Sequence, residues 1–227
     1  MRTAPVLRGG PVVRSIWLVA GLFLFACGIV CFLESRLGLA PWDVLHQGIA
    51  RRTPLSFGVA NEVVGVIVLG IAWLLGARVG LGTIANAVLI GLFVLVLQPL
   101  HAVQSLAHWP VAGRAGLLAA GLVCFGVGSA LYIGAALGAG PRDSLMLVGS
   151  LRAGMRLGAV RAVIETTVLI AGFLLGGRVG VGTLTFAALI GPSVEGSFWL
   201  ISRTPIARPR SPRAVAPARA DTPGAPL

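Results

Sequence analysis

The sequence is poor in charged residues. They make up only 11% of its 227 positions, only seven residues are acidic, and lysine is absent. A soluble domain usually carries about 25% charged residues, so this scarcity argues against a soluble globular protein. The 18 basic residues are all arginine and give a net charge of +11, but they lie mainly between or beyond the apolar runs. We therefore interpret them as charges that orient a membrane protein, and we expect no nucleic-acid partner.

Cysteine and histidine are scarce as well. Cys27, Cys31 and Cys124 all fall inside apolar runs, so they form no disulfide framework and are predicted to be small buried hydrophobes. Cys27 and Cys31 share a helix face, but no third or fourth metal ligand accompanies them. His101 and His108 also lack such company and are interpreted as residues of the membrane interface. The sequence therefore predicts neither a metal site nor a cofactor.

Catalytic motifs are missing too. The sequence contains no G-x-S-x-G, H-E-x-x-H or Walker motif. Its loops are also too short to hold a soluble catalytic domain. An enzyme is therefore the least favoured class, and we predict that the protein is not one.

Hydrophobic residues, by contrast, make up 56% of the chain, and the mean hydropathy is +0.93. They form long unbroken runs, and about 20 apolar residues span the roughly 30 Å hydrocarbon core as a helix rising about 1.5 Å per residue. Helices suit this environment because they pair every backbone amide internally. The sequence predicts an all-α, polytopic membrane bundle with six spans, at about 16–35, 57–76, 84–103, 115–136, 159–177 and 183–201.

The remaining segments complete the predicted organisation. Residues 1–15 are basic, and the run after them lacks a small-residue cleavage site, so we expect an uncleaved first span rather than a signal peptide. Residues 16–202 form the transmembrane domain, and the Arg/Pro-rich residues 203–227 are predicted to be a disordered tail. With the N-terminus inside, the inner segments hold 13 arginines and the outer segments 5. Both termini are therefore predicted to be cytoplasmic.

The chain also contains an internal repeat. Residues 37–91 aligned without a gap on residues 137–191 are identical at 22 of 55 positions. The matches include three pairs of chemically distinctive residues, Pro41/Pro141, Asp43/Asp143 and Arg78/Arg178. We infer a duplication, with repeat 1 over about 16–103 and repeat 2 over about 115–201. Because three spans per repeat is an odd number, the second copy should be inverted relative to the first, as in many transporter folds.

Each repeat contains the same tight turn, RVGLGT at Arg78–Thr83 and RVGVGT at Arg178–Thr183. Its glycines permit positive φ and its threonine (Thr83 or Thr183) can cap the next helix, which favours a helix connector with an interfacial arginine. The alternative is an anion site, with the arginine beside the positive start of a helix. Small residues at four-residue spacing could also bring helices together, within the chain, in a homo-oligomer or with a membrane partner: Ala72, Gly76 and Gly80, matched by Gly172, Gly176 and Gly180.

A second repeated element is an interrupted segment, residues 42–52 and 142–152. Each follows a Gly/Pro break and carries an aspartate, Asp43 or Asp143, that we interpret as a helix N-cap. Paired interruptions in two halves are also typical of a transporter's binding region. If the segments re-enter the membrane, both aspartates face a cavity. If they lie flat on the surface, they are only connectors.

Three glutamates fall inside the apolar runs. Glu62 and Glu165 lie near the starts of the second and fifth spans at repeat positions three apart, hence on one shared face, and Glu195 lies near the middle of the sixth. An ionised group there costs about 2.5–3.5 kcal/mol on insertion scales, so it needs a partner, a cavity or a proton. Asn61 and Arg161 are candidate partners. Glu62 and Glu165 could instead be interfacial or structural, whereas Glu195 is the strongest functional candidate.

The segment LGLAPWDVLHQGIA, the glycine at Gly58 and the turn RVGLGT, together with their second copies, carry a resemblance to a known family. On these motifs the chain resembles the bacterial YczE membrane proteins, within the broader YczE/YyaS/YitT-like group, over roughly residues 16–201. The resemblance implies a multi-pass protein of the bacterial inner membrane. It implies no activity, because none is established for that group.

Two functions follow as hypotheses. The first is a secondary transporter or exporter of a small organic solute, with the carboxylates Glu195, Glu62 and Glu165 carrying protons or cations and the two aspartates lining the pathway. The second is a non-transporting accessory or scaffold protein that regulates another membrane complex. It would act through the small-residue helix faces or through the tail.

Overall fold

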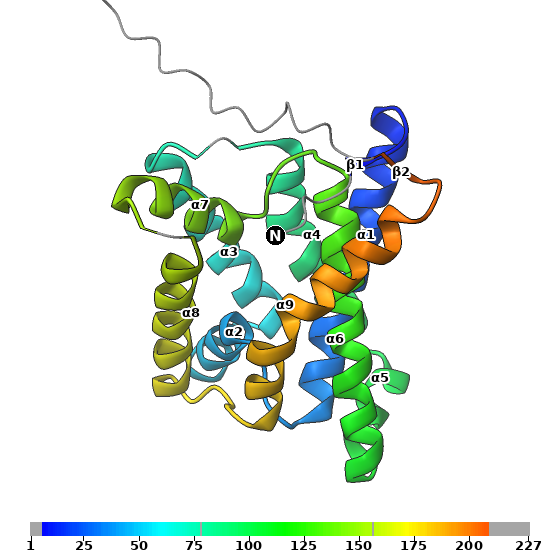
Figure 1. Ribbon diagram of the computed structural model, residues 1–227. Helices are drawn as coiled ribbons and strands as arrows, with labels where there is room; N and C mark the ends of the chain where they lie inside the picture. Colours follow the sequence, from blue (N-terminus) through cyan, green and yellow to red (C-terminus); the bar gives the residue numbers. More distant parts are fainter. Residues whose placement is uncertain (1–5, 78, 156, 209–227) are drawn as a thin grey trace, which may run out of the picture.

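The computed structural model describes residues 6–77, 79–155 and 157–208, and this part of the chain is almost entirely helical (Figure 1). Its helices are α1 (Pro11–Ser35), α2 (Pro41–Arg52), α3 (Phe57–Leu74), α4 (Leu81–Leu97), α5 (His101–Ser105), the 3-10 turn η1 (Leu106–His108), α6 (Val111–Gly134), α7 (Pro141–Ala153), α8 (Leu157–Leu174) and α9 (Val181–Ser202). The predicted helical bundle is confirmed. A strand pair that was not predicted, β1 (Val6–Leu7) with β2 (Ala207–Arg208), joins the two ends of the described part.

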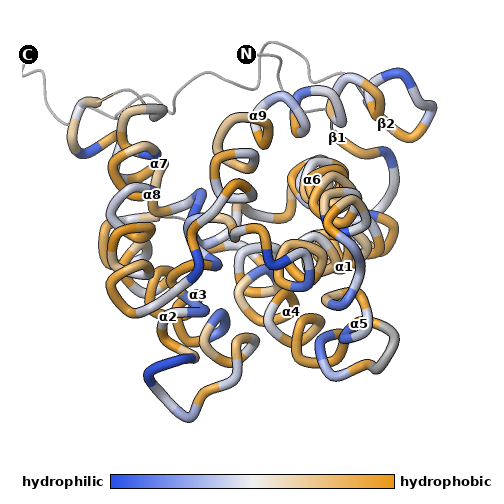
Figure 2. The backbone as a smooth tube through the Cα atoms, turned by 90° about the horizontal axis from the view of Figure 1, so that it is seen from below, coloured by the Kyte–Doolittle hydropathy of each residue, from blue (hydrophilic) through white to orange (hydrophobic). Residues whose placement is uncertain are grey.

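The outer surface of the bundle is apolar. Trp73, Phe173 and Leu184 are 65%, 62% and 71% exposed. Exposing such large apolar side chains to water is unfavourable, whereas exposing them to lipid is not. In Figure 2 most of the helical backbone is coloured as hydrophobic, and hydrophilic stretches lie mainly at the turns and near the centre of the view. Within the described residues, four helices rather than the six predicted are long and apolar enough to cross a membrane, α1, α3, α6 and α9, while α4 is apolar but shorter.

The helices α1 and α6 form the most extensive contact in the fold. Glycines allow their backbones to meet: a Cβ on Gly21 would lie 2.8 Å from the carbonyl oxygen of Gly128, and one on Gly28 would lie 3.0 Å from that of Gly121. Such close approach is the role of small residues in membrane helix packing. These four glycines are two pairs 100 positions apart, the same offset as the sequence repeat. They lie outside residues 37–91 and 137–191, so the same offset also relates α1 to α6.

The short helices α2 and α7 each pack on a long helix from the other half of the sequence, α2 on α8 and α7 on α3. At the first of these crossings, a Cβ on Gly48 would lie 2.7 Å from the carbonyl oxygen of Gly172. Figure 1 shows α2 toward the lower end of the molecule and α7 toward the upper end. The two halves of the chain are therefore interlocked rather than folded side by side.

Both short helices begin at a proline. Ala40 and Gly140 are the N-cap residues and Pro41 and Pro141 follow, so Asp43 and Asp143 lie in the first turn and not at the cap. This corrects the predicted N-cap role. Proline suits the first helical position because its fixed φ is already helical and its missing N–H would have no partner there.

The repeated turns dock on the opposite half. Gly82 donates its backbone N–H to the carbonyl oxygen of Leu137 (2.9 Å), and Gly182 donates to that of Leu37 (2.8 Å). The hydroxyl oxygens of Thr83 and Thr183 accept hydrogen bonds from the amides two residues before those glycines, at 3.1 and 3.3 Å. Each turn thus holds the break that precedes a short helix of the other half. This reciprocal docking explains why the chain contains the turn twice.

Two arginines make a further pair of equivalent contacts. Nε of Arg14 donates to the carbonyl oxygen of Ala135, and Nε of Arg114 donates to that of Ser35, both at 2.6 Å. Each guanidinium therefore satisfies carbonyl groups at the end of the partner helix, where a positive charge is favourable.

The ends of the described chain are tied together. Leu7 of β1 is 2% exposed and packs with Ala207 of β2 and with Ile201 of α9. The guanidinium of Arg203 lies 3.8 Å from the centroid of the Trp199 ring. The segment predicted as a disordered tail thus begins with six ordered residues, because they find a strand partner and an aromatic ring. Residues 209–227 lie outside the described part.

The small-residue faces are used within the chain. Gly172 lies against the backbone of α2, where a Cβ would come within 2.6 Å of Cα of Leu45, and Ala72 is fully buried. Gly80 and Gly180 pack on the carbonyl groups of the opposite half. The sequence offered these faces for a homo-oligomer or a membrane partner. In the structure most of these residues pack the two halves together, and a homo-oligomer or membrane partner at the remaining two, Gly76 and Gly176, stays a prediction.

Candidate functional site

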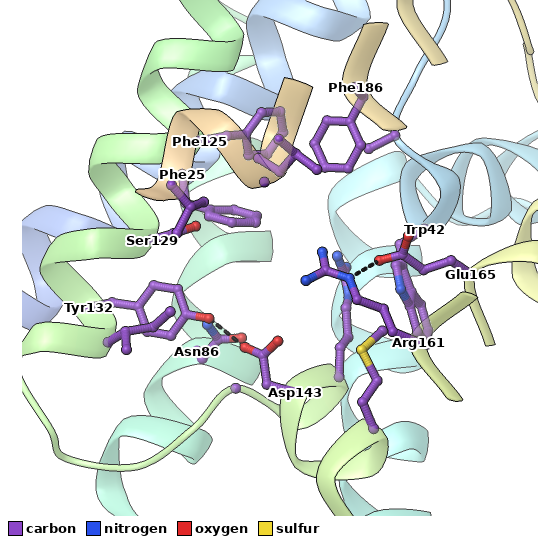
Figure 3. Close-up of a pocket in the computed structure, with 18 of the residues that line it drawn as sticks. Phe25, Trp42, Asn86, Phe125, Ser129, Tyr132, Asp143, Arg161, Glu165 and Phe186 are labelled. Carbon is purple, nitrogen blue, oxygen red and sulfur yellow. Dashed lines mark hydrogen bonds and ion pairs between the residues drawn. The ribbon is translucent and has the colours of Figure 1, made fainter. Parts of the chain in front are cut away.

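A cavity of about 340 Å³ lies between the helices, and seven of them contribute to its wall (Figure 3). Only α3 among the long helices contributes no residue within the described part. The volume is within the range of roughly 300–1,000 Å³ typical of small-molecule sites. One part of the wall is aromatic and apolar, with side chains from α1, α6 and α9. The other part is polar, with side chains from α2, α6, α7, α8 and α9.

The first turns of α2 and α7 meet at this cavity. Asp43 and Asp143, which occupy equivalent repeat positions, both line it. Helix N-termini carry partial positive charge and unpaired amides, so two of them converging make a polar centre in an otherwise apolar bundle. The structure thus places both predicted aspartates at one site.

Asp43 lies in an unusual environment. It is 1% exposed, and its Oδ1 is 3.4 Å from Nδ1 of His46 without the alignment of a hydrogen bond. Within the described residues both atoms are left without a hydrogen-bond partner, as is Nε1 of the neighbouring Trp42. Buried polar groups are nearly always paired. The start of α2 therefore presents three buried polar atoms that no hydrogen bond within the described residues satisfies.

Arg142 of α7 reaches across to the other half of the chain. It donates a hydrogen bond to Oδ1 of Asn61 in α3 (3.0 Å), and it lies 3.5 Å from Nε2 of His46. Its guanidinium also lies 4.9 Å from the centroid of the Trp42 ring, a cation–π distance. Asn61, predicted as the partner of a carboxylate, is instead the partner of this arginine.

Two further pairs fix the polar wall. The hydroxyl of Tyr132 donates to Oδ2 of Asp143 at 2.6 Å, and Nε of Arg161 donates to Oε1 of Glu165 at 2.8 Å (Figure 3). Arg161 and Glu165 are one helical turn apart on α8, and their side chains are 48% and 23% exposed. The predicted pairing of Arg161 with an intramembrane glutamate is therefore seen, and the glutamate is Glu165.

The glutamates separate into two groups. Glu195 on α9 and Glu165 on α8 line the cavity, whereas Glu62 is not among its lining residues. Glu62 instead packs against Gly91 of α4, so closely that a Cβ added to Gly91 would collide with Cγ of Glu62. Four of the five predicted carboxylates therefore converge on one cavity. Their predicted roles as pathway residues stay predictions.

The turn residues lie away from this cavity. The N–H of Arg178 donates to Oε1 of Gln47 at 2.7 Å, and its side chain is exposed. Arg78 lies outside the described residues. Since Gly82 and Gly182 already donate to carbonyl groups, these contacts explain the motif as a connector. Its second interpretation, an anion site, stays a prediction.

Sequence reasoning did not single out two residues of the site. Arg142 was counted only as an orienting charge, although it occupies the repeat position of Trp42 and directly precedes Asp143. Tyr132 is the only tyrosine in the chain, set in a run of small and apolar residues. A lone phenol there needs a hydrogen-bond partner, and that requirement was the available signal.

Comparison with known proteins places this architecture. Residues 12–197 match a family of unknown function, DUF6198. The chain belongs to this family. It is 36% identical over 188 residues to a protein of Haemophilus influenzae whose printed name is "Uncharacterized protein", covering 83% of this chain and 84% of the relative. It is 33% identical over 182 residues to the uncharacterized membrane protein YczE of Bacillus subtilis, covering 79% and 83%.

A more distant relative within Bacillus subtilis is the uncharacterized protein YyaS, 25% identical over 176 residues and 75% of this chain. No solved structure matches the chain. The predicted YczE-like identity is thus confirmed, and with it a membrane protein. Because the match spans residues 12–197, both short helices and every cavity-lining residue except Phe198 lie inside the part that the family shares.

Proposed function

We propose that this member of the family is a secondary transporter of a small organic solute, built from two inverted halves around the central cavity. In this arrangement α1, α3 and α4 span the membrane in one half, and α6, α8 and α9 in the other. At about 1.5 Å per residue, the 17 residues of α4 and the 18 of α8 are about 25 Å and 27 Å long, at the short end of what spans a bilayer.

Equivalent contacts support the inversion. The pairs Gly82–Leu137 and Gly182–Leu37, and the pairs Arg14–Ala135 and Arg114–Ser35, relate the halves in both directions. The short helices α2 and α7 would enter from opposite faces as half-helices, with exposed Arg51, Arg52 and Arg152 at their outer ends. The β1–β2 pair brings the two ends of the described part to one face, and the arginine excess of the sequence favours the cytoplasmic face of the inner membrane.

The observation that carries the proposal is the convergence of two half-helix starts and four carboxylates on one cavity. Carboxylates are costly inside a membrane and are retained where an ion or solute passes. Discontinuous helices that meet near the midplane form the binding sites of many inverted-repeat transporters. Glu195 would have the central role, since it lines the cavity and, within the described residues, makes no ion pair or hydrogen bond with another side chain.

Reconstitution of the full chain in proteoliposomes tests the proposal. Solid-supported membrane electrophysiology would record the current on addition of amines, amino acids or organic acids. We expect at least one class to give a current, and Glu195→Gln to reduce it at least tenfold. Glu34→Gln, a carboxylate of α1 that does not line the cavity, is the matched control and should behave like the parent protein.

Two results would contradict a transporter. One is the absence of flux for all three classes of solute. The other is flux that Glu195→Gln leaves unchanged. A cellular phenotype that survives neutralisation of Glu62, Glu165 and Glu195, but is lost when residues 203–227 are deleted, would point to the accessory role instead.

A further inference from the structure

The charges around the cavity do not balance. Among the described residues its lining holds four carboxylates and two guanidinium groups, those of Arg142 and Arg161; the carboxylates are those of Asp43, Asp143, Glu165 and Glu195. The formal excess is two negative charges. A carboxylate in this environment requires a partner, so the imbalance is itself information about what enters.

Both guanidinium groups are already engaged. Arg161 is paired with Glu165, and Arg142 is held by Asn61 and by the ring of Trp42. Each guanidinium therefore already has a partner, and an anionic ligand would be held only by the N–H groups that these contacts leave over. The acidic side of the site, in contrast, has unused capacity, because Asp43 is buried with Oδ1 unpaired and Glu195 has no side-chain partner within the described residues.

The opposite wall is aromatic. The rings of Phe25 and Phe125 pack edge to face with centroids 4.7 Å apart, and Phe125 packs in the same way on Phe186 at 5.3 Å. Phe198 and the ring of Tyr132 extend this wall. Aromatic faces attract cations through their quadrupole, most strongly where water is excluded.

We propose that the cavity binds a small organic cation with an aromatic or aliphatic body, such as a tertiary or quaternary amine. Its charge lies toward Asp43 and Glu195, and its body lies against Phe25, Phe125 and Phe186. This inference deepens the proposed function, since it names the class of solute.

The competing ligand classes fit less well. An anion would add to an existing excess of negative charge. A neutral apolar molecule would fill the aromatic part and leave Oδ1 of Asp43 without a hydrogen-bond partner. A bare metal ion would leave the aromatic wall unused, and within the described residues no group of three or more histidine, cysteine or acidic side chains could hold one.

Calorimetric titration of the full chain in detergent micelles, with protein-free micelles subtracted, tests the inference. The probes are benzyltrimethylammonium, neutral benzyl alcohol and anionic benzenesulfonate, which share the ring and differ in charge. We expect saturable 1:1 binding of the cation alone. Glu195→Gln should weaken it at least tenfold, and Asp43→Asn should do the same, whereas Glu34→Gln should leave it unchanged.

The variants are chosen so that misfolding does not decide the result. Glu195 is exposed at the cavity wall, so its replacement should preserve the thermal midpoint, and Asp43→Asn is counted only if it does the same. Tighter binding of benzenesulfonate than of the cation would overturn the inference. So would the absence of cation binding at millimolar concentration, or cation binding that Glu195→Gln leaves unchanged.

Flux measurements separate this inference from the proposed function. If benzyltrimethylammonium binds at the cavity but no solute crosses the membrane, the cation site stands and the transporter is wrong. If flux is found only for anionic or neutral solutes, and the cation does not compete, the transporter stands and the cation site is wrong.

Discussion

The helix pairs α3/α4 and α8/α9 occupy equivalent places in the two halves, yet they are packed differently. α4 lies along α3, and α9 lies along α6 without a comparable contact to α8 within the described residues. Gly91 of α4 is buried, and a Cβ there would lie 2.8 Å from the carbonyl oxygen of Gly58. Its equivalent on α9, Gly191, has open space around it and lines the cavity.

This difference shows how one duplicated sequence produces an asymmetric site. The half in which the helices are closed covers Glu62, and the half in which they are apart opens Glu165 and Glu195 to the cavity. Inverted repeats that exchange such closed and open arrangements give alternating access. On the proposed function, the structure corresponds to one of the two states.

Cross-linking gives the largest expected contrast between the pairs. A Cβ on Gly65 would lie 3.9 Å from Cβ of Ala87, within the range of a disulfide. With the native cysteines replaced by alanine, Gly65→Cys combined with Ala87→Cys should oxidise almost completely. The equivalent pair, Glu165→Cys with Ala187→Cys, should stay reduced because α9 is not packed along α8. Maleimide labelling and mass spectrometry would count the free thiols.

The same pairs can show whether the two arrangements exchange. A solute that drives transport should decrease oxidation of the first pair. The second pair is compared only without solute, because Glu165→Cys removes a carboxylate of the cavity. Equal oxidation of both pairs without solute would mean that the open gap between α8 and α9 is not the dominant state in solution.

A smaller effect is expected from adding one methyl group to each half. Gly91→Ala should lower the free energy of unfolding by about 1–3 kcal/mol, because the new Cβ overpacks the α3/α4 contact. Gly191→Ala should change it by less than about 1 kcal/mol. Nothing lies within 4 Å of the new Cβ, and the gain in helix propensity is opposed by Pro192, whose ring disfavours a Cβ on the preceding helical residue. Thermal unfolding in detergent compares the two, and an equal loss in both would show that α8 and α9 are also packed together.

Much of this architecture could be predicted from the sequence, because it depends on local patterns. The apolar runs predict helices, and Pro41 and Pro141 mark where the short helices begin. The docking of each RVGxGT turn on the opposite half could not be predicted, since a backbone contact such as Gly82 to Leu137 leaves no periodic signal. Comparing the two repeats shows which residues are equivalent. It does not show which face of each helix is covered by the other half of the chain.

The candidate site was predicted in part for the same reason. Both aspartates and two of the three glutamates line the cavity, and their position is predictable because rare charged residues in apolar runs face the interior of a bundle. Glu62 was expected to share a face with Glu165, and helix periodicity alone supports that. The two differ in the structure because α4 covers this face on α3 while the face on α8 is left open to the cavity, a difference of tertiary packing that periodicity does not encode.

The smallest of the three contrasts concerns the two aspartates. Asp143 accepts a hydrogen bond from the hydroxyl of Tyr132, whereas the position equivalent to Tyr132 in α1 is Phe32, and Asp43 keeps Oδ1 unpaired. Tyr132→Phe makes the two halves more alike. It should lower the free energy of unfolding by about 1.5 kcal/mol, because a hydrogen bond to a charged group is lost. It should also leave Asp143 free to compete for the bound cation. Thermal unfolding measures the first effect, and calorimetry with benzyltrimethylammonium measures the second. If neither changes, Asp143 finds another donor, and the asymmetry between the aspartates is not a feature of the site in solution.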